Sequence, residues 1–177
     1  MGIRNYLIEG VSGTGKTSVA SELQRRGYHV IHGDRELAYQ GDPQTGEPLD
    51  GATCVQDGTL DVIFRHAHHI WNVDRVKSLL ADHAQPVSFF CGGSRNFDHF
   101  IDWFDGVFVL DIDLGTLNKR LADRPCEEFG GKPDERALIL RLHETKEDTP
   151  GNATIIDATA PLVRVVDDIL TGCGLPG

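Results

Sequence analysis

A glycine-rich segment near the amino terminus constrains this chain more than any other feature. Residues 10–17 read Gly-Val-Ser-Gly-Thr-Gly-Lys-Thr. They follow a short apolar run at 4–9, which predicts a buried strand, and lead into residues 16–26, whose apolar positions share one helical face. In such a loop the glycines let successive N–H groups point inward, and the helix adds the positive end of its dipole. The segment therefore predicts a site for the phosphates of a nucleotide.

The side chains of this segment predict more than phosphate binding. Lys16 is expected to reach the β- and γ-phosphates, and the hydroxyl of Thr17 is expected to ligate Mg²⁺. A glycine-rich turn that matched by accident would lack the strand and the helix on either side. The expected nucleotide contacts are Gly10, Ser12, Gly13, Thr14, Gly15, Lys16, Thr17 and Ser18.

Composition narrows the class of protein. The length of 177 residues predicts a single domain over 1–177, and the formal net charge of −10 argues against a general nucleic-acid binder. No apolar run approaches the roughly 20 residues that span a bilayer, and no signal pattern opens the chain, so we expect a cytoplasmic monomer or homodimer with no membrane partner. Scattered cysteines without a Cys-x-x-Cys pair favour reduced thiols: Cys54, Cys91, Cys126 and Cys173.

The remaining sequence alternates between strand and helix patterns. Strands are expected at 4–9, 28–32, 86–91, 106–112 and 153–157, and helices at 16–26, 34–40, 59–83, 96–103, 114–123, 135–147 and 160–171. Gly/Pro-rich stretches at 41–58 and 124–134 predict loops. We therefore predict a three-layer α/β fold, with a five-stranded parallel sheet, helices on both faces and a short lid at 124–134. Ligands of such sheets lie outside the carboxyl ends of the strands.

Two classes of phosphate-loop protein fit poorly. A GTPase needs a guanine-reading motif after a strand, whereas Thr145-Lys146-Glu147-Asp148 has the letters of that motif at the end of a helix, where an exposed helix end is the favoured interpretation. An AAA+ or transport ATPase needs more chain and an apolar strand that ends in an acid. The strand Val87–Phe90 is followed instead by Cys91-Gly92-Gly93.

Size, strand order and flap together resemble the small P-loop kinases, which include the nucleoside monophosphate, shikimate and gluconate kinases and chloramphenicol phosphotransferase. His32-Gly33-Asp34-Arg35 follows the second strand. The resemblance implies that Asp34 faces the acceptor hydroxyl, with Arg35 beside it. Asp34 can orient that hydroxyl, accept its proton or contact Mg²⁺. The alternative is that Asp34 only caps the following helix.

A second resemblance lies in Cys91-Gly92-Gly93-Ser94-Arg95-Asn96, after the third strand. In this superfamily such a turn holds an anionic group of the acceptor, which implies substrate contacts by Gly92, Gly93 and Arg95. A tight turn with a solvated arginine explains the same residues equally well.

Two further segments resemble the nucleotide side of these kinases. Arg120 and Arg124 share a helix face at the entry to the lid and are implied to contact the adenine and the phosphates. Thr159 and Pro161, in the turn after the last strand, are implied to border the adenine. A strand-to-helix turn capped by Thr159 needs no ligand and remains the alternative.

The acceptor-binding region, about 35–83, departs from every family named above. His66, His68 and His69 lie beside Trp71, and Trp71 is offered as a ring that can stack on the acceptor. A metal site at these histidines lacks an obvious third ligand, so a polar face with a buried tryptophan is favoured. Acids in the insert suit a neutral or cationic acceptor slightly better than a nucleotide: Asp42, Glu47, Asp50 and Asp57.

These patterns converge on an ATP-dependent phosphotransferase with a small acceptor, a nucleoside, nucleotide or other hydroxyl metabolite. Lys16, Asp34, Arg120 and Arg124 are the expected catalytic residues, ATP and Mg²⁺ the expected cofactors, and Thr17 and Asp34 the expected metal contacts. Two alternatives stay open. One is a nucleotide-binding regulator, because no acid ends the third strand, and the other is an NTP hydrolase without a dedicated acceptor.

Overall fold

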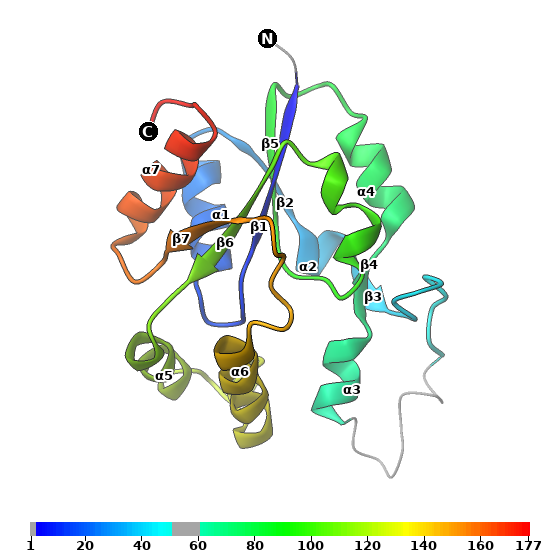
Figure 1. Cartoon of the computed structure of the whole chain (residues 1–177), viewed down its shortest axis with the longest axis vertical. Helices are drawn as coiled ribbons and strands as arrows, with labels where there is room; N and C mark the ends of the chain where they lie inside the picture. The colour runs from blue at the N-terminus through cyan, green and yellow to red at the C-terminus, as the bar shows by residue number, and fades with distance from the viewer. Residues whose placement is uncertain (1–2, 51–60) are drawn as a thin grey trace.

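The computed structural model describes residues 3–50 and 61–177. Its main sheet has five parallel strands in the order β2-β5-β1-β6-β7 (Figure 1). The strands are β1 (Arg4–Glu9), β2 (His29–His32), β5 (Val87–Cys91), β6 (Gly106–Asp111) and β7 (Thr154–Asp157). The register pairs Tyr6 with Phe89 on one side of β1 and with Gly106 on the other. The predicted five-stranded parallel sheet is confirmed.

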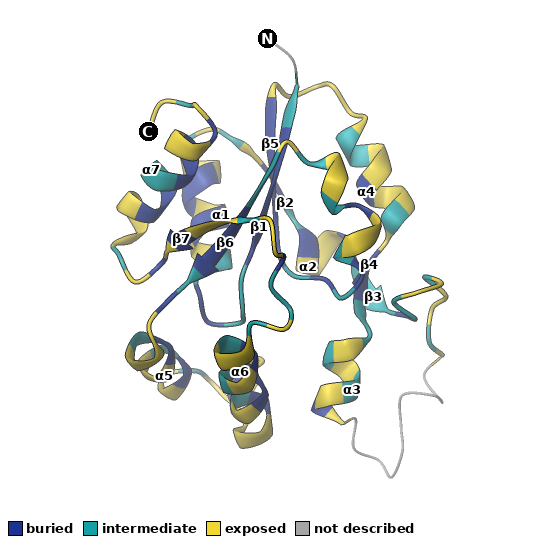
Figure 2. Ribbon diagram, viewed as in Figure 1, coloured by how far each residue is buried: buried dark blue, intermediate teal, exposed yellow. Residues whose placement is uncertain are grey.

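Helices cover both faces of the sheet, as the alternation of strand and helix patterns predicts. One face is covered by α1 (Lys16–Arg25) and α7 (Leu162–Gly172), and the other by α4 (Val73–Leu80) with the 3₁₀ helices η1 (Phe97–His99) and η2 (Ile101–Trp103) (Figure 1). Successive side chains of a strand point to opposite faces. Tyr6 and Ile8 accordingly join the core under α1 and α7, while Leu7 joins the core under α4. Figure 2 shows that the buried residues of the helices lie on the sides that face the sheet.

Three helices gather beyond the carboxyl ends of the strands (Figure 1). They are α3 (Val62–Ala67), α5 (Leu114–Ala122) and α6 (Pro133–Thr145). The predicted lid forms the connection between α5 and α6. Val62 of α3 packs against Leu138 and Leu142 of α6 in a small separate core. The helices of the insert and of the lid region therefore meet above the edge of the sheet where a ligand is expected.

The insert region differs from the prediction in its secondary structure. The predicted helix at 34–40 is instead α2 (Gly33–Glu36) followed by β3 (Ala38–Gln40). The predicted helix at 59–83 is divided into α3, β4 (His69–Trp71) and α4, with its first two residues outside the described part. β3 and β4 pair antiparallel, and the side chain of Asn72 caps α4. The predicted helix at 96–103 is the pair of 3₁₀ helices. Pairing across the insert overrides local helical periodicity here.

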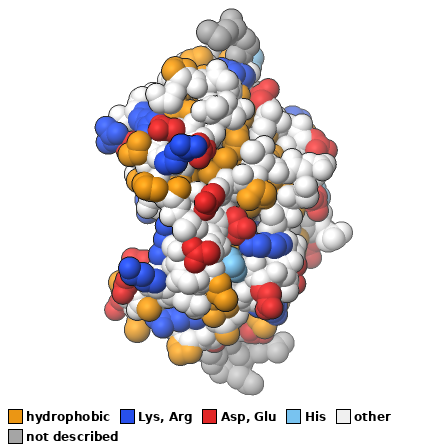
Figure 3. Space-filling model, turned by 60° about the vertical axis from the view of Figure 1, so that its left-hand side comes forward, with side chains coloured by type: hydrophobic (Ala, Val, Ile, Leu, Met, Phe, Trp, Pro, Cys, Tyr) orange, Lys and Arg blue, Asp and Glu red, His pale blue; other side chains and the backbone are white. Residues whose placement is uncertain are grey.

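Three further features concern membrane helices, cysteines and surface charge. No helix in ranges 3–50 and 61–177 is long and apolar enough to cross a membrane. Cys91, Cys126 and Cys173 are free thiols, and Cys54 and Asp57 lie outside the described ranges. Acidic and basic side chains are interspersed on the face that Figure 3 displays, so that face carries no continuous basic patch.

Candidate functional site

The phosphate loop has the backbone that its glycines predict. Gly13 and Gly15 have φ of 98° and 103°, a region that side chains with a Cβ rarely adopt. Gly15 begins α1 without a side-chain cap, so the first N–H groups of the helix are left for a ligand. The ammonium of Lys16 donates to the carbonyl oxygens of Gly10 and Val11. Burial lowers the pKa of Lys16, and the charges of Asp34 and Glu9 oppose that shift.

Two arginines of the lid region lie directly on this loop. Arg120 donates to the carbonyl oxygens of Gly13 and Thr14, at 3.2 and 3.1 Å. Arg124 donates to the hydroxyl of Ser12 at 2.9 Å and to the carbonyl of Phe129. The loop and these arginines line a cavity of about 700 Å³, called the donor cavity below. Guanidinium groups at this position can neutralise the charge of a polyphosphate.

The donor cavity also contains the oxygen ligands that Mg²⁺ prefers. Thr17 lies in the first turn of α1, and Asp34 in α2; both line the cavity, together with Arg35. A hydroxyl and a carboxylate beside a polyphosphate are ligands suited to this hard cation. The residues present therefore fit the metal, and Thr17 and Asp34 are the residues that would contact it.

Asp34 lies where two cavities meet. Its Oδ1 accepts from the backbone N–H of Gly93 at 3.0 Å and lies 3.3 Å from Nε2 of His69. Burial acts to raise the pKa of Asp34, but the hydrogen bond with His69, the charge of Lys16 and the N–H of Gly93 together lower it. The N-cap of α2 is His32, so the alternative that Asp34 only caps the helix is wrong. Asp34 is thus held as a carboxylate with its second oxygen, Oδ2, outside these contacts.

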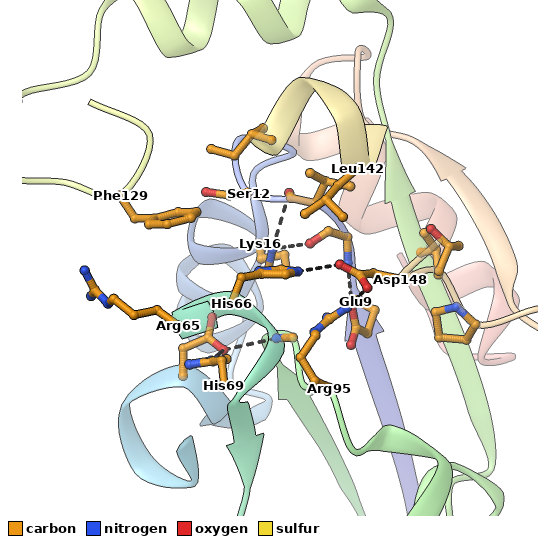
Figure 4. A pocket seen from close by; sticks show the side chains of 18 of the residues that line it. Glu9, Ser12, Lys16, Arg65, His66, His69, Arg95, Phe129, Leu142 and Asp148 are labelled. Atoms are coloured by element: carbon orange, nitrogen blue, oxygen red, sulfur yellow. Dashed lines mark hydrogen bonds and ion pairs between the residues drawn. The ribbon is translucent and has the colours of Figure 1, made fainter. Parts of the chain in front are cut away.

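A second cavity, of about 350 Å³, adjoins the donor cavity and is called the acceptor cavity below (Figure 4). Ser12, Lys16 and Asp34 line both cavities. Arg95 lies in the wall with its side chain only 12% exposed, so the solvated arginine considered above is not what the fold contains. Its Nη1 is 2.6 Å from Oδ1 of Asp148, and Oδ2 of Asp148 is 2.5 Å from Nε2 of His66.

Asp148 also decides the guanine-motif question. It follows α6 and faces the acceptor cavity, whereas the donor cavity is lined by other segments of the described chain. The 145–148 segment is therefore not at the nucleotide site. The sequence favoured an exposed helix end for this segment, but the side chain of Asp148 is only 24% exposed.

Glu9 is a buried acid that the sequence analysis missed. It ends β1 directly before the phosphate loop and is 4% exposed. It accepts from the N–H groups of Ser94 and Gly10, at 3.2 and 3.3 Å. Burial raises its pKa, and the charges of Arg95 and Lys16 oppose that shift. A carboxylate at the last position of a buried apolar strand was the available signal, because such a group is costly without a partner.

Trp71 lies in the core and lines neither of the two cavities described above. It is fully buried and stacks on Phe100, with ring centroids 5.7 Å apart. A Cβ on Gly33 would lie 2.0 Å from its ring, and one on Gly92 would lie 2.7 Å from it. The prediction that Trp71 stacks on the acceptor is therefore wrong: the ring supports the two turns that carry Asp34 and Arg95.

The other predicted contact residues are divided between the two cavities and their surroundings. Gly93 lines the acceptor cavity, whereas Gly92 packs beneath it, and Arg35 lies on the donor side. The turn after β7 lines the donor cavity through Ala158, Ala160 and Leu162. Pro161, and not Thr159, is the N-cap of α7. His68 stacks on Phe64, and no group of three or more metal-binding side chains occurs within 3–50 and 61–177.

Comparisons with known proteins agree with this geometry. Residues 7–141 match a family described as AAA domain, and no curated protein sequence gives a match. The shikimate kinase of Bacteroides thetaiotaomicron is similar in structure, with a TM-score of 0.61 and 14% identity over 97% of this chain and 99% of that one. A sugar kinase from a Janibacter species has a TM-score of 0.58 and 17% identity over 98% and 95% of the two chains. The gluconokinase of Sinorhizobium meliloti has a TM-score of 0.54 and 20% identity over 97% of this chain and 91% of that one.

The family match and the structural matches meet at the phosphate loop. The match to an AAA domain family corrects the expectation that this class fits poorly. No acid follows the third strand, but Glu9 at the end of β1 lies beside the phosphate loop. The match covers well over half of the sequence, and the three solved structures named above are a sugar kinase, a gluconokinase and a shikimate kinase. The chain therefore belongs to the AAA domain family and has the fold of the small P-loop kinases.

Proposed function

We propose that this chain is a phosphotransferase that moves the γ-phosphate of ATP to a hydroxyl group of a small molecule. The observation that carries the proposal is that the donor and acceptor cavities meet at Ser12, Lys16 and Asp34. An ammonium and a carboxylate at this junction suit the two halves of the reaction. The similar solved structures, kinases of a sugar, gluconate and shikimate, support the same reaction type.

Charge neutralisation is the task of the donor side. The ammonium of Lys16 and the guanidinium groups of Arg120 and Arg124 converge on the phosphate loop, where negative charge develops on the transferred group. Thr17 would bind Mg²⁺ directly and Asp34 would contact it through a water molecule, which leaves the carboxylate able to accept a proton; the bound ion would supply further neutralisation. These groups are in place before reaction, which reduces the reorganisation that the transition state requires.

Asp34 acts on the acceptor. Its carboxylate is ionised at neutral pH because its pKa is lowered, and it is fixed by Gly93 and His69. The acceptor oxygen attacks the γ-phosphorus while its proton passes to Asp34, and the bond from phosphorus to the β–γ bridging oxygen breaks. The products are the phosphorylated acceptor and ADP.

The lid joins the two cavities. Phe129 lines the acceptor cavity, while its carbonyl oxygen accepts from Arg124 in the donor cavity. Movement of this segment can therefore close over both substrates together. Exclusion of water by such closure favours transfer to the acceptor over hydrolysis.

The decisive test is ATP consumption against a panel of nucleosides, nucleotides, sugars and other hydroxyl compounds. We expect acceptor-stimulated turnover, with loss of about 1,000-fold or more in Lys16→Ala and about 100-fold or more in Asp34→Asn. Asp102→Asn, an exposed acid of η2, is the matched control and should retain activity. An active Lys16→Ala protein would refute the mechanism. Turnover with water alone would indicate a hydrolase, and ATP binding without acceptor-stimulated turnover would indicate a regulator.

A further inference from the structure

The acceptor cavity contains an arginine whose charge is already neutralised by the protein. Arg95 lies in the wall with its side chain 12% exposed, and Nη1 donates to Asp148 at 2.6 Å. Its Nε is buried without a partner among the described residues. An arginine that served as a clamp for an anionic ligand would present its paired donors to the cavity. Here a carboxylate of the chain itself takes one of these positions.

Asp148 is held in that position from two sides. Oδ1 contacts Arg95, and Oδ2 lies 2.5 Å from Nε2 of His66 on α3. The backbone of Thr149 donates to the carbonyl of Lys146 and closes the turn, while the N–H of Arg95 donates to the carbonyl of His69. The ion pair therefore joins three segments, and displacing Asp148 from Arg95 would disturb all of them.

The charges around the two cavities also disfavour an anion in the acceptor cavity. The donor cavity has four cations and two acids, whereas the acceptor cavity has three of each: Lys16, Arg65 and Arg95 against Glu9, Asp34 and Asp148. Of these cations, Lys16 lies on the phosphate loop. Arg65 is exposed and points away from Asp148 in Figure 4, where water weakens its attraction for an anion.

An anionic acceptor would have to compete with this arrangement. Pairing with Arg95 would require removal of Asp148, which would leave a largely buried carboxylate without its partner. Binding next to the intact pair would place the anion beside Asp148, and like charges at short range repel. A neutral hydroxyl compound meets neither penalty, and it can exchange hydrogen bonds with the polar wall.

One part of the wall is apolar. Val11, Phe129 and Leu142 line the acceptor cavity, and the Phe129 ring is 37% exposed. Figure 4 shows Phe129 across the cavity from Asp148. An aromatic ring on one side and hydrogen-bonding groups on the other suit a ligand with one apolar and one hydroxylated face.

We infer that the acceptor is an uncharged hydroxyl compound with an apolar face, and that Asp148 determines this specificity by occupying Arg95. The inference rests on the phosphotransfer function proposed above, and it names the substrate class of the same site. Asp148 acts through Arg95 and is therefore a specificity-determining residue without a direct part in the transfer step.

Matched acceptor pairs test the inference in the unaltered protein. A nucleoside is compared with its 5′-monophosphate, and ribose with ribose 5-phosphate, by kcat/KM in ATP-dependent transfer. We expect the neutral member of each pair to be preferred. A preference for the phosphorylated members would overturn the inference while leaving the proposed phosphotransferase intact; absence of transfer to every compound would count against the proposed function itself.

A binding measurement that needs no turnover tests the role of Asp148. Inorganic phosphate is titrated calorimetrically into protein saturated with Mg²⁺ and a non-hydrolysable ATP analogue, which fills the phosphate loop. Asp148→Asn should bind phosphate about tenfold or more tightly than the unaltered protein, because Arg95 loses its internal anion. Unchanged phosphate affinity in this variant would overturn the inference.

Three controls isolate the ion pair. Glu147→Gln removes the same charge from the neighbouring residue, whose partner is the exposed Arg141, and should leave phosphate affinity unchanged. His66→Gln removes the other contact of Asp148 and should still exclude phosphate. The gain of Asp148→Asn should disappear when Arg95→Gln is added; a gain that persists would show binding elsewhere and would contradict the inference. Asp148→Ser replaces Asp148→Asn if the latter does not fold.

Discussion

The donor and acceptor cavities share three residues but are built in different ways. The donor cavity is formed chiefly by one continuous segment, residues 12–19, with Arg120 and Arg124 added from the lid side, and its cations exceed its acids. The acceptor cavity draws on residues from β1, α3, β4, the turn after β5 and the loop after α6, and its charges balance. Net positive charge suits a polyphosphate, which brings its own counter-charge. Because the charges of the acceptor cavity balance, a ligand there would have to be recognised by its shape and by hydrogen bonds.

Replacing Arg124 should separate the two cavities in a kinetic experiment. Arg124→Gln removes a cation that contacts Ser12 in the donor cavity, so we expect transfer to fall by about 100-fold or more. The KM of ATP should rise more than the KM of the acceptor, as measured by varying each substrate. Lys119→Gln, on an exposed position of the same helix, is the control and should behave as the unaltered protein. A large rise in acceptor KM alone would break the division into two cavities.

Replacing Gly33 should damage both cavities through the core beneath them. In Gly33→Ala the new Cβ would meet the Trp71 ring at 2.0 Å, and Trp71 is fully buried in the core. We expect the free energy of unfolding in urea to fall by about 1–3 kcal/mol, with loss of transfer because Asp34 follows this residue. Gly151→Ala, whose Cβ would meet nothing within 4 Å, is the control. An unaffected Gly33→Ala protein would show that the turn tolerates displacement.

The smallest expected effect is the pH dependence of the acceptor wall. Burial acts to raise the pKa of Asp148, but its contacts with His66 and Arg95 lower it overall. As the pH falls, the unfolded chain therefore takes up the proton of this carboxyl before the folded protein does. The stabilisation by Asp148 is complete above the usual carboxyl pKa, near pH 4, and it is lost as the pH falls through the lowered pKa of the folded protein. The difference in unfolding free energy between the unaltered protein and Asp148→Asn should therefore shrink from pH 7 to pH 3. A difference that does not change with pH would contradict the ion pair.

The parts of the fold that the sequence predicted correctly have local signals. The five strands of the main sheet are short apolar runs bounded by glycine, proline or polar residues, and all five appear near their predicted positions. The secondary structure of the insert was predicted poorly because its apolar residues follow a helical periodicity that the fold does not use. Ile70 and Trp71 continue a helical periodicity, yet they form a strand that pairs with residues 38–40 on the far side of the insert. Pairing between segments so far apart leaves no mark in either segment alone.

By itself, the sequence determined the phosphate loop and the layered sheet, because a loop with glycines, lysine and threonine between a strand and a helix has few other conformations. Only the tertiary structure decided which residues line the acceptor cavity. Glu9, Arg95 and Asp148 lie far apart in the chain, and their charges interact only when the strands and α6 bring them together. Electrostatic interactions depend on distance and burial, and neither is written in the order of residues.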